Sequence, residues 1–169
     1  MTSNEEHWEA AQEGAERLAE GDPEGAQQVL EQLVEEDPEN EYGYFFLGTA
    51  HYEQENYAKA LAAYVRALEL APEYVGAMVN AGHTLRMLGR YDQAIRMARQ
   101  VLARDKHDPD ALFLMGASYF ARGDNKAAME HLQAFLETGP EFEVATEAEG
   151  MLQIIRGEVV EALPSEEPD

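Results

Sequence analysis

The stretch EYGYFFLGTAHYEQENYAKALAAYVRALELAPEY, residues 41–74, decides the fold, because its small and helix-ending residues recur along the chain at one fixed interval. Its glycine, alanine and proline each belong to a column of residues spaced 34 apart. These columns are Gly14, Gly48, Gly82 and Gly116; Ala26, Ala60, Ala94 and Ala128; and Pro38, Pro72 and Pro140, with Lys106 in the remaining proline place. Such a period indicates a repeat protein in which each unit stacks on its neighbours.

The columns predict that each unit is a helix, a short turn and a second helix. Glycine inside a helix costs about 1 kcal/mol relative to alanine, so its recurrence indicates that another helix approaches closely there. The alanine found 12 residues after each glycine is expected to be its small counterpart on the second helix. Proline ends the second helix because it cannot continue the hydrogen-bond ladder. Polar turns such as residues 20–23 and 123–125 separate the two helices.

The unit resembles the tetratricopeptide repeat (TPR) family, whose pattern is W-x2-L-G-x2-Y, then A-x3-F, then P. Residues 41–74 carry this pattern most fully, in Tyr44, Leu47, Gly48, Ala60, Tyr64, Ala67 and Pro72. The resemblance implies an all-α fold, a right-handed superhelical solenoid of four 34-residue helix–turn–helix repeats at residues 7–40, 41–74, 75–108 and 109–142.

A C-terminal capping helix is expected to follow the last repeat. Val144, Ala148, Leu152, Ile155 and Val159 recur at helical spacing and predict one long helix over residues 143–163. Residues 1–163 therefore form a single TPR domain in this interpretation, and the proline-containing residues 164–169 form a flexible acidic tail.

Composition excludes several classes of function. The net charge of −22 argues against nucleic acid as a partner, because phosphate binding needs clustered Lys and Arg. No apolar run reaches the length of about 18 residues that a membrane span requires, so no direct membrane insertion is expected. The N-terminus is acidic and lacks the features of a secretory signal, and we expect a cytoplasmic protein.

Catalytic and metal-binding motifs are lacking from the sequence. There is no cysteine, and the five histidines fall at five different positions of the repeat, without an HExxH motif. Phosphate-binding glycine loops and the GxSxG motif are missing as well. We therefore predict a protein that is not an enzyme, with no cofactor and no metal.

The resemblance implies a candidate peptide-binding groove, because in TPR proteins the first helix of each repeat lines a concave surface. The positions that correspond to this surface are unusually aromatic, with polar groups supplied by the third repeat. The candidate groove residues are Trp8, Tyr42, Phe45, Thr49, Tyr52, Val79, Asn80, His83, Arg86, Met87, Phe113 and Phe120. The alternative is that some of these aromatic residues belong to the core, with Phe120 packed against the capping helix.

The groove is not expected to hold an acidic peptide. Some TPR proteins grip the acidic tails of heat-shock chaperones through Lys, Asn and Arg at fixed positions, and of these positions only Asn80 matches here. An apolar or aromatic segment of a protein or peptide partner is therefore favoured.

Charge is distributed unevenly along the chain. Residues 1–40 contain 13 acidic residues and one basic residue, whereas residues 75–108 carry a net charge of +3. A candidate basic docking patch comprises Arg90, Arg96, Arg99, Arg104 and Lys106. Either these residues form a solvated face, or they dock an acidic partner, which includes the acidic first repeat of a second copy in a homo-oligomer.

Three functions remain open at this point. The first is a protein–protein interaction adaptor that binds its partner in the aromatic groove. The second is a secretion-type chaperone that holds an extended client segment, an interpretation suggested by resemblance to the type III secretion translocator chaperones. The third is a self-assembling scaffold that joins the acidic first repeat to the basic third repeat.

Overall fold

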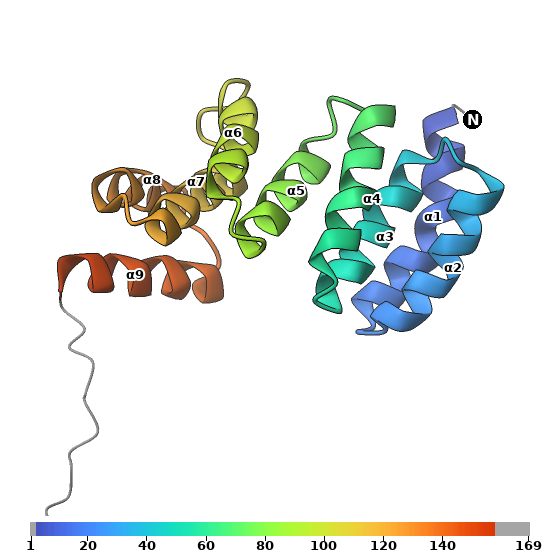
Figure 1. The fold of residues 1–169 in the computed structure, drawn as a ribbon, viewed down its shortest axis with the longest axis horizontal. Helices are drawn as coiled ribbons and strands as arrows, with labels where there is room; N and C mark the ends of the chain where they lie inside the picture. The colour runs from blue at the N-terminus through green and yellow to red at the C-terminus, as the bar shows by residue number, and fades with distance from the viewer. Residues whose placement is uncertain (1–2, 158–169) are drawn as a thin grey trace, which may run out of the picture.

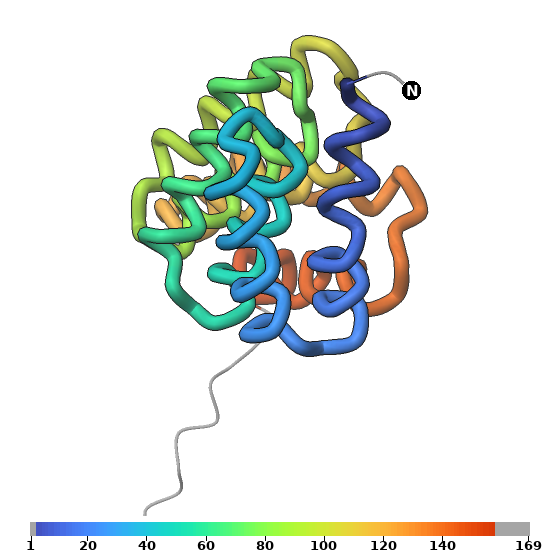
Figure 2. Tube along the Cα trace, turned by 90° about the vertical axis from the view of Figure 1, so that its right-hand side faces the viewer, coloured from blue at the N-terminus to red at the C-terminus, as the bar shows by residue number. Residues whose placement is uncertain are grey.

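A computed structural model describes residues 3–157, which form a stack of helices without strands. Successive helices pair as antiparallel hairpins, and the pairs follow one another from the N-terminal to the C-terminal end of the stack (Figure 1). The helices are α1 (Ser3–Ala19), α2 (Pro23–Glu36), α3 (Glu41–Glu53), α4 (Tyr57–Leu70), α5 (Val75–Met87), α6 (Tyr91–Leu102), α7 (Pro109–Arg122), α8 (Asn125–Glu137) and α9 (Phe142–Arg156). Figure 2 looks along the stack from its N-terminal end, with α9 behind the other helices.

The turns inside the hairpins repeat with the same period as the sequence. Gly21, Gly89 and Gly123 have φ angles of 77°, 73° and 89°, and Glu55 occupies the equivalent place with a φ of 60°. Glycine adopts this left-handed conformation without steric cost. Among the helices that follow these turns, α2 begins with both a proline and a capping side chain, since Asp22 accepts a hydrogen bond from the Gly25 amide at 2.9 Å.

Close packing within each hairpin depends on the glycine column, although not through the alanine that the sequence suggested. A Cβ atom at Gly48 would lie 2.7 Å from the ring of Tyr64, and one at Gly116 would lie 2.7 Å from Cγ of Leu132. In both cases the residue that fills the space lies 16 positions after the glycine rather than 12. The fully buried alanines of the column lie in the same core clusters as these residues, Ala60 with Tyr64 and Ala128 with Leu132.

In the third hairpin, the glycine is covered by a residue from the next hairpin. The residue 16 positions after Gly82 is Ala98, which is too short to cover the glycine. Leu114 reaches across from α7 and occupies that space, where a Cβ atom on Gly82 would overlap its side chain. Leu114 is completely buried, so this contact locks the third hairpin to the fourth.

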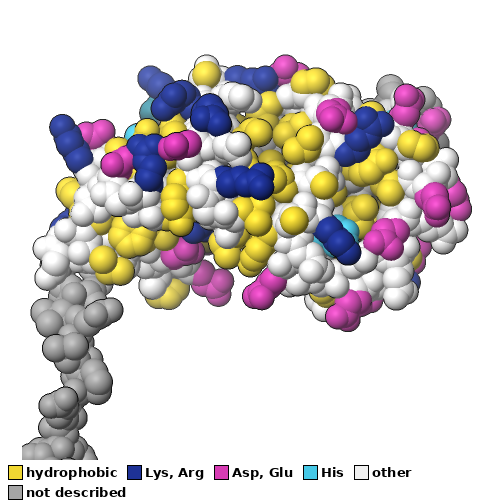
Figure 3. Space-filling model, viewed as in Figure 1, with side chains coloured by type: hydrophobic (Ala, Val, Ile, Leu, Met, Phe, Trp, Pro, Cys, Tyr) yellow, Lys and Arg dark blue, Asp and Glu magenta, His cyan; other side chains and the backbone are white. Residues whose placement is uncertain are grey.

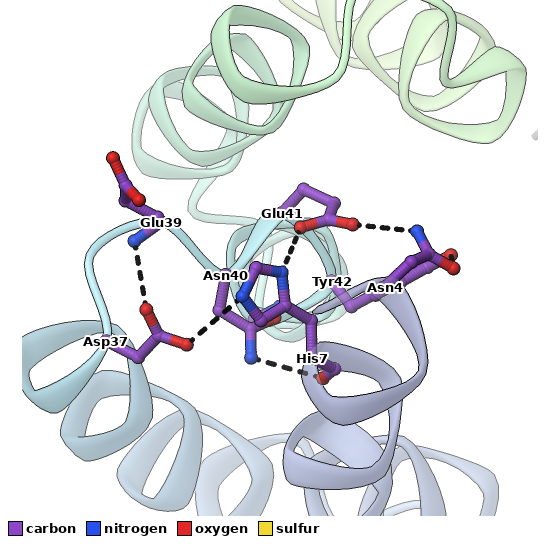
Figure 4. Close-up of polar contacts among 8 residues, drawn as sticks. Asn4, His7, Asp37, Glu39, Asn40, Glu41 and Tyr42 are labelled. Carbon is purple, nitrogen blue, oxygen red and sulfur yellow. Dashed lines mark hydrogen bonds and ion pairs between the residues drawn. The ribbon is translucent and has the colours of Figure 1, made fainter. Parts of the chain in front are cut away.

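A polar cluster fastens α1 to the loop between α2 and α3 (Figure 4). The ring of His7 lies between two carboxylates, with Nδ1 2.7 Å from Glu41 and Nε2 3.5 Å from Asp37. Asn40, which is fully buried, accepts from the Gly43 amide at 2.9 Å and donates to the carbonyl of His7 at 3.1 Å. One side chain thus caps α3 and holds α1 against it.

Helix α9 packs on α7 and α8 and buries Ala148 and Leu152 in their shared core. It ends earlier than the predicted residues 143–163, because Gly157 adopts a φ of 72° and caps the helix. The rest of the predicted cap, residues 158–163, and the predicted tail at residues 164–169 lie outside the described residues.

The packing predicts opposite effects for two substitutions at the same position of the period. Gly116→Ala is expected to lower the free energy of unfolding by about 1–3 kcal/mol, because the new methyl group overlaps Leu132. Gly150→Ala, 34 residues later in α9, is expected to raise it by up to about 1 kcal/mol, since a Cβ there meets no described atom within 4 Å. Urea unfolding followed by circular dichroism measures both, and equal effects would contradict this account of the glycine column.

Candidate functional site

Two hollows lie along the face formed by the first helices of the hairpins. The N-terminal hollow, between α1 and α3, is lined by Asn4, Glu5, Trp8, Glu9 and Tyr42. The larger central groove has a volume of about 480 Å³ and draws on five helices. Its lining residues are Thr49, Tyr52 and Glu53 from α3, Tyr64 from α4, Asn80, His83 and Arg86 from α5, Asp110 and Phe113 from α7, and Val144 and Glu147 from α9.

The floor of the central groove is a hydrogen-bonded set of neutral groups around Tyr64. Its hydroxyl lies 3.1 Å from that of Thr49 and receives a long hydrogen bond of 3.5 Å from the side-chain amide of Asn80. Burial raises the pKa of Tyr64 to about 12, so the phenol stays protonated at neutral pH. Asn80 keeps most of its hydrogen-bonding capacity for a ligand, because its contact with Tyr64 is at the limit of a hydrogen bond.

His83 is also neutral at physiological pH. Burial, followed by the positive charge of Arg86, lowers the pKa of His83 to about 4. Its ring lies beside that of Phe113, with 6.0 Å between ring centres. Phe113 in turn packs on Phe135 at 5.2 Å, so the wall of the groove is continuous with the core beneath it.

Arg86 is the one cation among the described residues that line the central groove. Its Nε atom is buried and has no hydrogen-bond partner within that part of the chain. A buried donor without a partner is costly, so a ligand that offers an acceptor here would be favoured. The guanidinium lies close enough to Tyr52 to influence the phenol, whose pKa is raised mainly by burial, with Arg86 opposing the rise.

Carboxyl groups outnumber this cation. Glu53, Asp110 and Glu147 all line the central groove, and Glu53 and Glu147 are exposed. Burial and the neighbouring Asp108 raise the pKa of Asp110. The groove therefore presents a cation and neutral donors within a surround of acidic groups.

The N-terminal hollow combines an aromatic surface with carboxylates. Trp8 is 46% exposed and packs edge-on against Tyr42, with 5.2 Å between ring centres. Glu5 and Glu9 from the same helix line the hollow, and none of the lining residues that the structure describes is Lys or Arg.

The structure gathers most of the candidate groove residues into these two places. Six of them line the central groove, namely Thr49, Tyr52, Asn80, His83, Arg86 and Phe113. Trp8 and Tyr42 line the N-terminal hollow. Phe45 lies between the two, half-buried against Tyr64 and Tyr74.

Three candidate groove residues are placed elsewhere. Val79 is 6% exposed and belongs to the core with Met78 and Val101, because it faces the neighbouring hairpin. Phe120 packs against the core shared by α7, α8 and α9, as the alternative interpretation proposed. Met87 is exposed at the end of α5 and lines neither hollow.

The candidate basic patch lies on α6 and the loops that flank it. Figure 3 shows Lys and Arg side chains gathered over α6. Arg104 is already paired with Glu73 at 2.7 Å, whereas Arg90, Arg96, Arg99 and Lys106 form no ion pair with any of the described residues. Arg90 and Arg96 share a shallow hollow with Arg122, which itself pairs with Asp92 and Asp124.

Five residues that line the central groove were not among the candidates, namely Glu53, Tyr64, Asp110, Val144 and Glu147, and for the last two and Tyr64 the repeat pattern gave no indication. Tyr64 belongs to the second helix of its hairpin, and Val144 and Glu147 belong to α9, so none is at a family groove position. No local feature of the sequence indicated that α9 would border the groove, because Glu147 is one of several exposed glutamates on that helix.

Metal-binding and membrane-spanning features were also sought in residues 3–157. This range holds no cluster of three or more His, Cys, Asp or Glu side chains arranged to hold a metal ion. None of its helices combines the length and the apolar character that crossing a membrane requires.

Comparison with known proteins links this geometry to a family. Residues 7–142 match the family described as the cytochrome c-type biogenesis protein H TPR domain. Among curated relatives, tetratricopeptide repeat protein 8 of Caenorhabditis elegans is 26% identical over 47% of this chain and 16% of its own length. Human DnaJ homolog subfamily C member 7 is 29% identical over 56% of this chain, and the match spans only 19% of that protein.

Solved structures share the fold. A MamA structure (41-end) from Desulfovibrio magneticus RS-1 has a TM-score of 0.75 at 20% identity, covering 93% of this chain and 88% of that one. A thermophilic TPR protein from Thermus thermophilus has a TM-score of 0.70 at 20% identity, covering 82% and 77% of the two chains. These likenesses confirm the predicted all-α TPR solenoid.

The environment of His83 predicts a pH dependence of stability. The pKa of His83 in the folded state, about 4, lies below the ordinary value of 6.5. Between pH 6.5 and pH 4, therefore, His83 binds a proton in the unfolded chain but not in the folded chain. Stability is therefore lost as the pH falls through this window, by roughly 2–3 kcal/mol from this group. Urea unfolding at pH 7 and about pH 4.5 should show a smaller loss for His83→Gln than for the wild type. Equal losses would contradict a neutral His83.

Proposed function

Because the chain belongs to the TPR family, in the branch of the cytochrome c-type biogenesis protein H TPR domain, we propose that it binds a segment of a partner protein in the central groove. Proteins with the TPR fold generally mediate protein–protein interactions and are generally not enzymes. The names of the similar proteins describe different cellular processes, so the proposal rests on the shared property of binding.

The observation that carries the proposal is the combination of shape and unused hydrogen-bonding groups. A groove of about 480 Å³ is large enough for several side chains of a peptide. Around it, Arg86 Nε has no partner among the described residues and Asn80 makes only one long hydrogen bond within them. An extended peptide offers carbonyl and amide groups that satisfy such side chains, while Tyr52 and Phe113 supply apolar contact area.

A chaperone that holds an extended client segment would use the same surface. The adaptor and the chaperone differ in what becomes of the bound segment, not in the groove chemistry, so one set of variants addresses both.

Arg86→Ala is expected to weaken partner binding by about tenfold or more, because it removes the cation of the groove from a desolvated position. Arg156→Ala, at the C-terminal end of α9, is the matched control because it removes the same charge from an exposed site outside the central groove and the basic docking patch. Proteins retained from native lysate by immobilised wild type and Arg156→Ala, but lost by Arg86→Ala, are the expected result in mass spectrometry. Retention of an identical set by Arg86→Ala would refute the assignment of the groove.

A second candidate, the self-assembling scaffold, is favoured by the exposed basic residues. Arg96 and Arg99 on α6 have no ion pair within the described chain. Residues 1–40, which include α1 and α2, carry 13 of the 34 acidic residues of the chain and one basic residue. Attraction between the acidic first hairpin of one copy and α6 of another would join two different surfaces, a head-to-tail contact that can repeat from copy to copy.

If the scaffold is formed, sedimentation at about 20 mM salt should reveal oligomers that dissociate at about 500 mM salt, where charges are screened. Arg96→Glu combined with Arg99→Glu should leave only monomer at both salt concentrations. An unchanged oligomer, or a wild type that is monomeric at low salt, would eliminate this candidate.

A further inference from the structure

The two hollows are joined by a continuous series of aromatic rings. Trp8 contacts Tyr42 at 5.2 Å between ring centres, and Tyr42 contacts Tyr74 at 5.6 Å. Tyr74 lies 4.7 Å from Phe45, whose ring is 6.0 Å from that of Tyr64 on the floor of the central groove. We call these five residues the aromatic ladder. It connects the N-terminal hollow to the central groove. Tyr64 is buried at its end, whereas Tyr42, Phe45 and Tyr74 are partly exposed, so an extended ligand can contact these three rings between the two hollows.

The N-terminal hollow has the chemistry of a site for a cation. Nearly half of the Trp8 surface is exposed, and the face of an indole ring attracts positive charge. The carboxyl group of Glu9 lines the same hollow and is exposed to solvent. A lysine or arginine side chain placed there would contact the ring and the carboxylate together.

The central groove has a similar excess of negative charge at its rim. Glu53 and Glu147 approach it from α3 and α9, and Tyr52 lies close enough to Glu147 to be influenced by that charge. Arg86 is the one opposing cation among the described lining residues. A cationic side chain is suited to the acidic rim, while the buried Nε of Arg86 is suited to donate to a backbone carbonyl of the same ligand.

We propose that the N-terminal hollow, the aromatic ladder and the central groove form one surface that binds an extended, cationic segment of a partner protein. One Lys or Arg side chain enters the N-terminal hollow, a second meets Glu53 and Glu147, and apolar side chains between them lie on the ladder. This inference rests on the proposed function and specifies the class of ligand.

Charge selects this ligand over the other classes. An acidic segment would bring like charges together at both hollows, which is costly in partly desolvated sites. A purely apolar segment would remove water from the carboxylates without supplying partners. The sequence predicted an apolar or aromatic ligand. The proposed ligand keeps an apolar middle part, which contacts the aromatic ladder, and adds a positive charge at each end. The net charge of −22 adds long-range attraction for such a segment.

The test uses the single tryptophan of the chain as a probe. Trp8 lies in the N-terminal hollow, so its emission reports occupancy of that hollow directly. Three synthetic peptides of about twelve residues, free of aromatic residues, share a Leu/Ser framework and carry Lys, Gln or Glu at the same positions. The Lys peptide is expected to change Trp8 emission saturably and to bind at least about tenfold more tightly than the Gln peptide, with the Glu peptide weakest.

Matched variants separate this surface from general attraction to an acidic protein. Glu53→Gln combined with Glu147→Gln should weaken the Lys peptide by about five- to tenfold, and Glu9→Gln should reduce both affinity and the Trp8 response. Glu24→Gln combined with Glu35→Gln changes the net charge equally on the outer helix α2 and should alter affinity by less than about twofold. Circular dichroism checks that each variant is folded.

Several results would overturn the inference. These are an unchanged Trp8 emission with the Lys peptide, equal affinity for the Gln peptide, or equal weakening by the α2 control. If the Gln peptide binds as tightly as the Lys peptide, and if Arg86→Ala lowers the affinity for the Gln peptide, the cationic ligand is rejected while the proposed function remains intact. If Arg86→Ala retains the same lysate proteins as the wild type, the proposed function itself is rejected.

Discussion

The close approach of the two helices in each hairpin at a glycine is the contact on which the rest of the structure depends. Glycine weakens its own helix, and the loss is offset because a large side chain from the second helix fills the space above it. Tyr64 fills that space at Gly48 and Leu132 fills it at Gly116. The two helices thereby approach closely at the same position of these hairpins, and the hairpins stack with their first helices along one inner face.

A departure from this rule in the third hairpin couples the C-terminal half of the molecule. Ala98 is too small to cover Gly82, and Leu114 from the following hairpin takes its place. Because this contact is made between hairpins rather than within one, it holds α5 to α7. These two helices carry His83, Arg86 and Phe113 of the central groove. Helix α9 then packs on α7 and brings Glu147 to the rim. The positions of the charged groups in the groove therefore depend on the packing of the core beneath them.

Charge and burial act in opposite directions within the groove. The exposed rim is acidic, as most of the chain is, whereas buried His83 and Tyr64 are kept neutral by the loss of solvent. A neutral floor, a partly buried guanidinium and an acidic rim give a surface that distinguishes ligands by the position of their charges. Cations also gather on α6, away from the groove, so the two surfaces differ in the partners that they can attract (Figure 3).

The period of 34 residues by itself determined the fold, since helix formation, turn chemistry and the close approach at glycine are local properties that repeat wherever the pattern repeats. The resemblance to the TPR family, rather than the period alone, predicted that Tyr52, Asn80 and Arg86 lie on the inner face, where they line the central groove. Only the tertiary structure decided which inner-face residues remain open and which, like Val79, are buried against a neighbour. It alone brought α9 to the groove and aligned Trp8 with Tyr64 through the ladder. Those relations depend on the angles at which helices distant in sequence pack, and no local pattern encodes these angles.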